Sequence, residues 1–187
     1  ATNYLMSDVG MYAKTDMGGG FQDNFDAKLT PTSGMGGGGD GNYMQRFWDQ
    51  GFNMVKYANS VLSYVDQVEG LDEKVKNAYK GRAYFHRAYA YYNLTLQFGD
   101  IPLITKLMTV PKQSYKSCSK EAIFQKLVHD LEFAAENVPS QRDMEYIGMV
   151  NQEACMHLLV KCYLVTGQYD KAEQVATDLI NNHGLRL

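Results

Sequence analysis

The sequence predicts an all-α fold in which helical hairpins follow a long irregular segment. From residue 43 onward, apolar residues recur in steps of three and four, which is the spacing of one helix face. Short breaks that contain Gly or Pro separate these stretches, as expected for helices joined by turns. Before residue 43, glycine is too dense for a regular element. We therefore expect a single region over residues 1–187, with an irregular loop segment at 1–42 and helical hairpins at 43–187.

The N-terminal segment contains two glycine clusters, at residues 18–20 and 34–41. Long irregular loops within ordered proteins are often functional. These glycines do not form a phosphate-binding loop, because no Gly-Lys-Ser/Thr sequence follows them and no strand pattern precedes them. A loop shaped by a ligand and a plainly disordered segment are the two interpretations that remain open.

Residues 43–68 are expected to form the first long helix. Its inward stripe steps four-three-four-three and consists of Trp48, Phe52, Val55, Asn59 and Leu62. Trp48 is therefore predicted to be a core residue rather than a ligand platform. A buried asparagine costs about 1–3 kcal/mol unless its amide is hydrogen-bonded. Asn59 is therefore expected to have buried polar partners.

The longest apolar pattern ends at Phe98 and predicts a central helix that is covered on most sides. Small residues around Gly81 would let neighbouring helices approach closely. Asp72 is the expected N-cap, Gly99 suits a left-handed residue after the helix, and Pro102 excludes its continuation. One face is predicted to comprise Val75, Ala78, Arg82, Phe85, Tyr89, Tyr92 and Leu96, and a second face Tyr84, Ala88 and Tyr91.

Three more helix patterns follow. Ser119 is expected to cap a helix that ends before Pro139, and another begins near Val150 or Asn151 and breaks at Gly167. Residues 163–187 read like half of a tetratricopeptide repeat, in which a tight turn leads into a partner helix. The fold class is therefore all-α with tetratricopeptide-like hairpins. The inner faces are predicted to be Ile123, Leu127, Leu131, Ala134 and Ala135 in the first of these helices, and Ala172, Val175, Ala176, Leu179 and Ile180 in the last.

Composition argues against several classes of function. A net charge of -3 provides no basic surface for nucleic acid. The three cysteines lack metal-ligand spacing, so we expect them to be free, buried thiols. The four histidines also lack such spacing, and we expect His86 and His129 to be structural side chains beside apolar neighbours. No set of residues resembles a catalytic site, and the chain is predicted to be neither an enzyme nor a holder of a metal or cofactor.

A binding function fits the sequence better. Flat aromatic rings with a few polar groups at their rim recognise sugar rings and peptide side chains. Such residues occur in the irregular segment and at the start of the first helix. The candidate ligand-binding residues are Tyr12, Phe21, Asp40, Asn42 and Tyr43. The alternative, in which these aromatic residues only pack the loop onto the helices, remains open.

Residues 81–103 resemble the signature of the SusD/RagB family, the surface nutrient-binding lipoproteins of Bacteroidetes. Residues 48–59 and 119–139 resemble further elements of that family, and Arg82 stands where the family commonly has Glu. The residues that match the signature are Gly81, Ala83, Phe85, Arg87, Ala88, Tyr92, Leu94, Phe98, Gly99, Asp100, Pro102 and Leu103.

The resemblance implies a lipid-anchored protein on the extracellular face of the outer membrane, with the anchor outside this chain. It implies a polysaccharide, oligosaccharide or peptide ligand, and a TonB-dependent SusC-like transporter for which the protein serves as receptor and lid. It also implies that the chain is an N-terminal portion of a longer protein. The alternative function is a tetratricopeptide-type scaffold that binds a partner protein. A lipobox cysteine upstream would favour the receptor, and a cytosolic start the scaffold.

Overall fold

The computed structural model describes residues 43–184 except 111, 113, 145 and 147. The chain divides into two compact units, residues 1–50 and residues 51–187. The elements, in chain order, are α2 (Tyr43–Tyr64), the 3-10 turn η2 (Val65–Gln67), α3 (Glu73–Phe98), β1 (Ile101–Pro102), β2 (Ser117–Cys118), α4 (Lys120–Asn137), the 3-10 turn η3 (Gln141–Asp143), α5 (Gln152–Val165) and α6 (Tyr169–Asn182).

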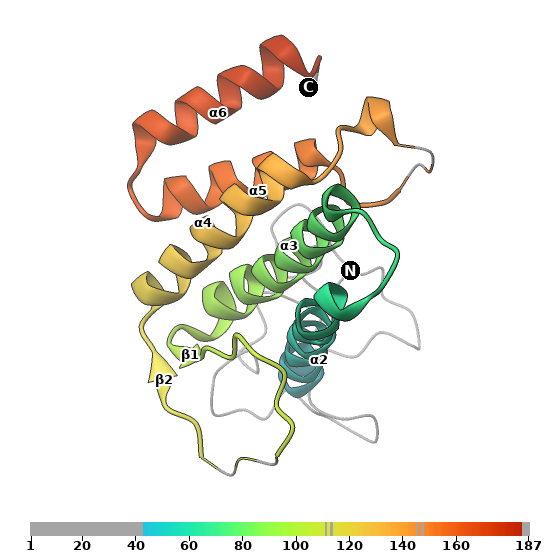
Figure 1. Ribbon diagram of the computed structural model, residues 1–187. Coiled ribbons are helices and arrows are strands. Elements are labelled where there is room, and N and C mark those ends of the chain that lie inside the picture. Colours follow the sequence, from blue (N-terminus) through green and yellow to red (C-terminus); the bar gives the residue numbers. More distant parts are fainter. Residues whose placement is uncertain (1–42, 111, 113, 145, 147, 185–187) are drawn as a thin grey trace, which may run out of the picture. The chain divides into compact units, whose positions relative to one another are not determined.

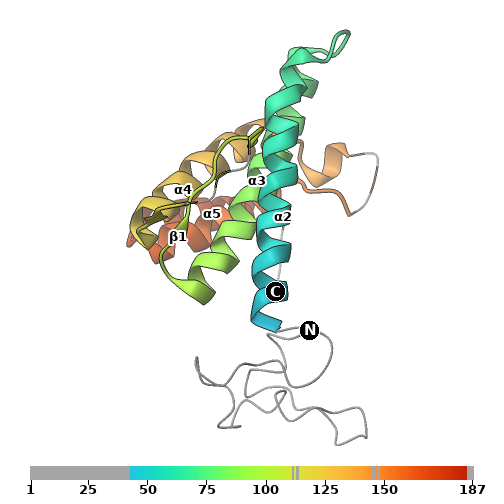
Figure 2. The ribbon, with the colours of Figure 1, turned by 90° about the horizontal axis from the view of Figure 1, so that it is seen from below.

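Each helix of the larger unit packs against its neighbour in sequence, α3 with α4, α4 with α5 and α5 with α6 (Figure 1). From residue 51 onward, α2 runs along α3, which Figure 2 shows from a second direction. Here the Phe52 ring meets Tyr91 edge-on, with ring centroids 6.2 Å apart. Within the described residues, the strands form a single antiparallel pair, β1 with β2. The prediction of an all-α fold of helical hairpins is confirmed.

The helix ends follow local capping chemistry. Asp72 precedes α3 as predicted, although its side chain makes no capping hydrogen bond. The Ser119 hydroxyl accepts from the Ala122 N–H at 3.2 Å, and the Asn151 side chain accepts from the Ala154 N–H at 2.8 Å. None of the helices in the described part of the chain is both long and apolar enough to cross a membrane.

Gly99 ends α3 with a positive φ of 76°, which confirms the need for glycine. Its ψ of -128° differs from the left-handed helical value that the sequence suggested. The reason is that the chain does not curl back over the helix end. It extends directly into β1, whose two residues pair with Ser117 and Cys118.

The longer of the two predicted faces of α3 is partly exposed. Val75, Tyr89 and Leu96 were assigned to the inward stripe, yet their side chains are 39%, 47% and 47% exposed. The second predicted face is the covered one, because Ala88 and Tyr91 are fully buried and Tyr84 is partly buried. Many residues of this face are small, because neighbouring helices approach closely there. The buried set is Ala78, Gly81, Ala83, Arg87, Ala88, Ala90, Tyr91, Leu94 and Thr95.

Gly81 shows how close that approach is. A Cβ atom at this position would lie 2.6 Å from the Val138 side chain and 3.3 Å from the Ala134 Cα atom, so any larger residue would push α4 away. Arg82, next to it, extends to the segment before α5, where its Nε donates to the Val150 carbonyl at 3.2 Å. The residue that departs from the family pattern therefore has a polar partner of its own.

The other helices follow their predicted stripes, except that Ile180 in α6 is exposed. In α2, the stripe is buried at Val55 and Asn59 and partly buried at Trp48. In α4, four of the five predicted inward residues are buried and Ala135 is partly buried. In α6, Ala172 and Leu179 are buried, but Ile180 is 64% exposed. Among the described elements, α6 packs chiefly on α5, so only a narrow face of this helix is covered.

Candidate functional site

The ligand-binding residues predicted from sequence fall mostly outside the part of the chain that the structure describes. Tyr12, Phe21, Asp40 and Asn42 lie in residues 1–42, and Tyr43 is the first residue of α2. The described helices offer further candidates. Three arrangements of polar side chains stand out there, two buried clusters and one hollow.

The first arrangement, the Arg87 cluster, consists of Arg87, Asp130, Asn59 and Lys126. The Arg87 guanidinium donates from Nε and Nη2 to the Asp130 Oδ2 atom, at 3.0 and 2.6 Å. Its Nη1 donates to Asn59 Oδ1 at 2.8 Å and to the Thr105 carbonyl at 2.9 Å. The Lys126 ammonium lies 2.7 Å from the other carboxylate oxygen of Asp130. The buried guanidinium and carboxylate are thus each paired, which a charge in the interior requires.

The Arg87 cluster holds the chain segment that follows β1. The Asn59 amide donates to the carbonyls of Ile104 and Lys106, at 3.0 and 3.3 Å. The Tyr91 hydroxyl accepts from the Ile104 N–H at 2.6 Å. Burial raises the pKa of Tyr91 to about 12, so its phenol stays protonated. Because every polar group is taken by another part of the chain, this cluster is structural, and the predicted polar partners of Asn59 are confirmed.

The second arrangement, the Glu153 cluster, consists of Glu153, Ser140, Gln141 and His183. Glu153 Oε1 accepts from the Ser140 hydroxyl at 2.5 Å, and Oε2 accepts from the Gln141 N–H at 3.0 Å. The Nδ1 atom of His183, just past α6, lies 2.8 Å from Oε1. Burial by itself would raise the pKa of Glu153, but these hydrogen bonds outweigh it and lower the pKa to about 2. This carboxylate joins the start of α5 to η3 and to the end of α6.

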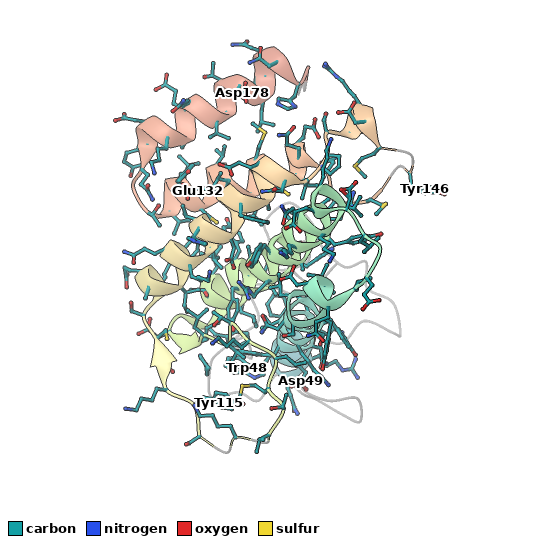
Figure 3. All side chains as sticks on the ribbon, in the orientation of Figure 1. Trp48, Asp49, Tyr115, Glu132, Tyr146 and Asp178 are labelled. Carbon is teal, nitrogen blue, oxygen red and sulfur yellow. The ribbon has the colours of Figure 1, made fainter. Side chains whose placement is uncertain are left out.

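The third arrangement is a hollow of about 580 Å³ between α4 and α6. Glu132 contributes from α4, Tyr163 from α5, and Lys171, Gln174 and Asp178 from α6. Figure 3 shows Glu132 and Asp178 on these two helices. The volume lies within the range of about 300–1,000 Å³ that small-molecule sites occupy. This is the arrangement among the three that leaves room for a ligand.

The floor of the hollow is held in place by three contacts. The Tyr163 hydroxyl donates to Glu132 Oε1 at 2.8 Å. The Lys171 ammonium lies 3.8 Å from the same oxygen and 5.3 Å from the centroid of the Tyr163 ring. Burial, followed by the hydrogen bond to Glu132, raises the pKa of Tyr163 above its ordinary value. The phenol therefore remains a hydrogen-bond donor, and its ring is covered by the ammonium.

The described residues provide little for catalysis or metal binding. His86 and His129 are exposed, contrary to the prediction of packed structural histidines, because both lie on the outer faces of their helices. The three cysteines are free as predicted, with Cys155 and Cys162 buried and Cys118 partly buried. Burial raises the pKa of Cys155 and of Cys162 to about 12, so neither forms a thiolate near neutral pH. No group of three ligand side chains suited to a metal occurs in this part of the chain.

The sequence did not predict the hollow or the two clusters. For Asp130 the sequence did indicate a buried position, since this residue lies at helical spacing from Leu127 and Ala134. In the structure Asp130 is 1% exposed. Gln174, Asp178 and Asn181 carried a weaker signal, a polar stripe in steps of four and three. Neither signal names the helix on the other side, which only the packing supplies.

Comparison with known proteins identifies the class. Residues 30–164 match the SusD-like family described as "Starch-binding associating with outer membrane". The match covers well over half of the chain, and the chain belongs to this family, as the resemblance of residues 81–103 implied.

Three relatives illustrate the similarity. "SusD-like protein P2" of Formosa agariphila is 28% identical over 147 residues, which are 78% of this chain and 28% of the relative. A crystal structure with xylogluco-oligosaccharide has a TM-score of 0.69 at 26% identity, over 77% of this chain and 30% of that one. A "Laminarin binding SusD-like protein" has a TM-score of 0.65 at 25% identity, over 72% and 29%. The chain thus spans less than a third of the length of these relatives.

Proposed function

We propose that this chain forms part of a cell-surface nutrient-binding protein, which captures a glycan or a peptide without cleaving it. The observation that carries the proposal is the match of residues 30–164 to a family described by starch binding and association with the outer membrane. The oligosaccharide and laminarin named for two related structures support a glycan over a peptide. A lipid anchor outside this chain would hold the protein at the extracellular face of the outer membrane.

The residues that we propose for ligand contact are those predicted from sequence, Tyr12, Phe21, Asp40, Asn42 and Tyr43. Calorimetric titration of the protein with xylogluco-oligosaccharide and laminari-oligosaccharides tests this assignment. Phe21→Ala and Tyr43→Ala should each weaken binding by about tenfold, since an aromatic contact contributes on the order of 1.4 kcal/mol. Tyr146→Ala is the matched control, because Tyr146 is 63% exposed in the larger unit (Figure 3). Equal affinities for all four proteins would overturn the assignment.

The proposed partner is a TonB-dependent SusC-like transporter, for which this protein acts as receptor and lid. A lid must cover a wide surface, so its interface should exceed the roughly 1,200–2,000 Å² of a standard complex and survive detergent extraction. The experiment is to tag the protein in its native cells, extract the envelope and identify what co-purifies. A barrel transporter in near-equal amount supports the proposal, and its absence from the purified material speaks against it.

A tetratricopeptide-type scaffold is the second candidate function. The observation in its favour is the exposed aromatic and apolar face of α3, where Tyr79, Tyr89 and Leu96 are 45%, 47% and 47% exposed. Exposed apolar side chains that gather on one face are typical of protein contact surfaces. If the co-purification recovers soluble proteins in place of a transporter, the scaffold is the better description.

A further inference from the structure

We propose that the hollow between α4 and α6 is a binding site for a neutral polyhydroxyl ligand, one or two sugar units of an oligosaccharide. The inference rests on the proposed function and adds to it a site that is separate from residues 12–43. It lies wholly within the unit of residues 51–187 and uses side chains from three helices.

The α6 wall of the hollow offers unused hydrogen-bonding groups. Gln174, Asp178 and Asn181 follow one another in steps of four and three, so they share a face of the helix. In the described part of the chain, the amides of Gln174 and Asn181 make no hydrogen bond, while the Asn182 amide donates to Asp178 Oδ1 at 2.5 Å. A side-chain amide both donates and accepts, as does a sugar hydroxyl. The wall is therefore suited to a row of hydroxyl groups.

The α4 side and the floor are already ordered before any ligand arrives. Tyr163 and Lys171 both contact Glu132 Oε1, which fixes this carboxylate and leaves its Oε2 atom without a hydrogen bond among the described residues. A fixed acceptor loses little side-chain entropy when a hydroxyl donates to it. The hollow thus presents one ordered acceptor on α4 and side-chain amides on α6.

The charges and surfaces of the lining decide the class of ligand. Two carboxylates against one ammonium, Glu132 and Asp178 against Lys171, disfavour an anion. A wholly apolar ligand would leave the carboxylates and amides of the lining without partners. A cationic peptide is the remaining competitor, but the Lys171 ammonium already lies beside Glu132. A neutral ligand whose hydroxyls both donate and accept fits all of these groups.

The test is a titration followed by NMR, with xylogluco-oligosaccharide and laminari-oligosaccharides as probes and a lysine-rich peptide as competitor. Addition of at least one of the sugars should shift the backbone amide signals of residues 171–182. The Gln174→Ala, Asn181→Ala double variant should weaken this response by about threefold or more, the loss expected for one or two hydrogen bonds. Both residues are exposed on α6 and alanine favours helix, so the variant should fold. Gln125→Ala, an exposed amide on α4, is the matched control and should leave the response unchanged.

Two results would overturn the inference. They differ in whether they also refute the proposed glycan-binding function. If the protein binds a sugar, and Phe21→Ala weakens that binding while the double variant leaves every response unchanged, only the site in the hollow is refuted. If no sugar binds and the peptide alone shifts residues 171–182, both the proposed glycan binding and the polyhydroxyl class of the hollow are refuted.

Discussion

The Arg87 cluster and the Glu153 cluster both cross-link helices through a carboxylate, but water reaches them to different degrees. The side chains of Arg87 and Asp130 are 3% and 0% exposed, whereas those of Glu153 and His183 are 6% and 17% exposed. The first pair lies between α3 and α4, near the middle of the packed helices. The second lies at the edge, where α5 begins and α6 has ended.

The two clusters also differ in which charges can change. Arginine keeps its charge at any pH at which proteins are folded, so the cation of the Arg87 cluster does not change, whereas the His183 ring that faces Glu153 can gain or lose a proton. Glu153 can be protonated, and its pKa of about 2 shows how strongly the fold favours its charged form. The two clusters use similar donors and acceptors. The Arg87 cluster specifies the packing of three helices, and the stabilisation by the Glu153 cluster depends on pH through the Glu153 carboxylate.

The largest effect is expected from Arg87→Met. This change leaves Asp130 buried without its guanidinium partner, beside Lys126 and the more distant His129 ring, and removes the donors to Asn59 and the Thr105 carbonyl. Breaking one side of a buried pair typically costs about 3–5 kcal/mol. Urea denaturation of the protein should show this loss, whereas Arg142→Met, at an exposed arginine in η3, should change the free energy of unfolding very little. Equal losses in the two variants would contradict the assigned role of burial.

A smaller and pH-dependent effect is expected from Glu153→Gln. The folded protein lowers the pKa of Glu153 from 4.5 to about 2, so the stabilisation is complete above pH 4.5 and is lost as the pH falls toward 2. At pH 7 the variant should be less stable by about 1–3 kcal/mol, because charged hydrogen bonds are removed. The difference between the two proteins should shrink between pH 4.5 and pH 2.

Thermal denaturation across this pH range measures that difference. The control is Glu136→Gln, which alters an exposed glutamate on α4. A plot of its melting temperature against pH should run parallel to that of the unchanged protein. A Glu153→Gln curve that runs parallel to that of the unchanged protein would show that the cluster is not the source of the pH dependence.

Gly99→Val tests whether the turn after α3 depends on the Arg87 cluster or on its own backbone. A valine must adopt a φ of 76° with a ψ of -128° here, a sparsely populated backbone conformation that costs about 1–3 kcal/mol, while the space around the position is open. The chemical denaturation midpoint should fall accordingly, and Gly99→Ala should fall by a similar amount because the strain arises in the backbone. An unchanged midpoint would mean that the segment held at residues 104–106 tolerates another turn.

The parts of this structure that were predictable are those decided by neighbouring residues. Ser119, Asn151 and Gly99 end or begin helices through contacts within a few positions, so their roles could be predicted from sequence. For α3 the sequence indicated two apolar faces, and it did not show that the one with Ala88 and Tyr91 is the better covered. Apolar residues occur around most of this helix, and only the approach of α4 at Gly81 shows which face is buried.

The candidate site was less predictable, because it joins residues far apart in the chain. Arg87 and Asp130 are 43 positions apart, and Glu132 and Tyr163 are 31 apart. Helical spacing indicates that a polar residue lies on a given face, but the partner across the interface depends on packing. The assignment of ligand-contact residues at 12–43 depends on composition alone. Four of these residues lie outside the described part of the chain, and Tyr43 is the first residue of α2.

The smallest effect is expected from Lys80→Met. This variant tests whether the stabilisation by the Arg87 cluster comes from its burial or from the short distance between its charges. Lys80 and Asp66 form an ion pair with an N–O distance of 2.5 Å, about as short as that between Arg87 and Asp130. However, Asp66 is 60% exposed, so water and salt screen the pair. Exposed pairs contribute roughly 0.2–1 kcal/mol.

The hydrogen bond to Asp66 raises the pKa of Lys80, so this contribution is present at neutral pH and is lost as the pH rises above 10.5. Urea denaturation at low and at high salt should show a small loss that disappears with salt. A loss as large as that of Arg87→Met would mean that contact distance, rather than burial, sets the strength of both links.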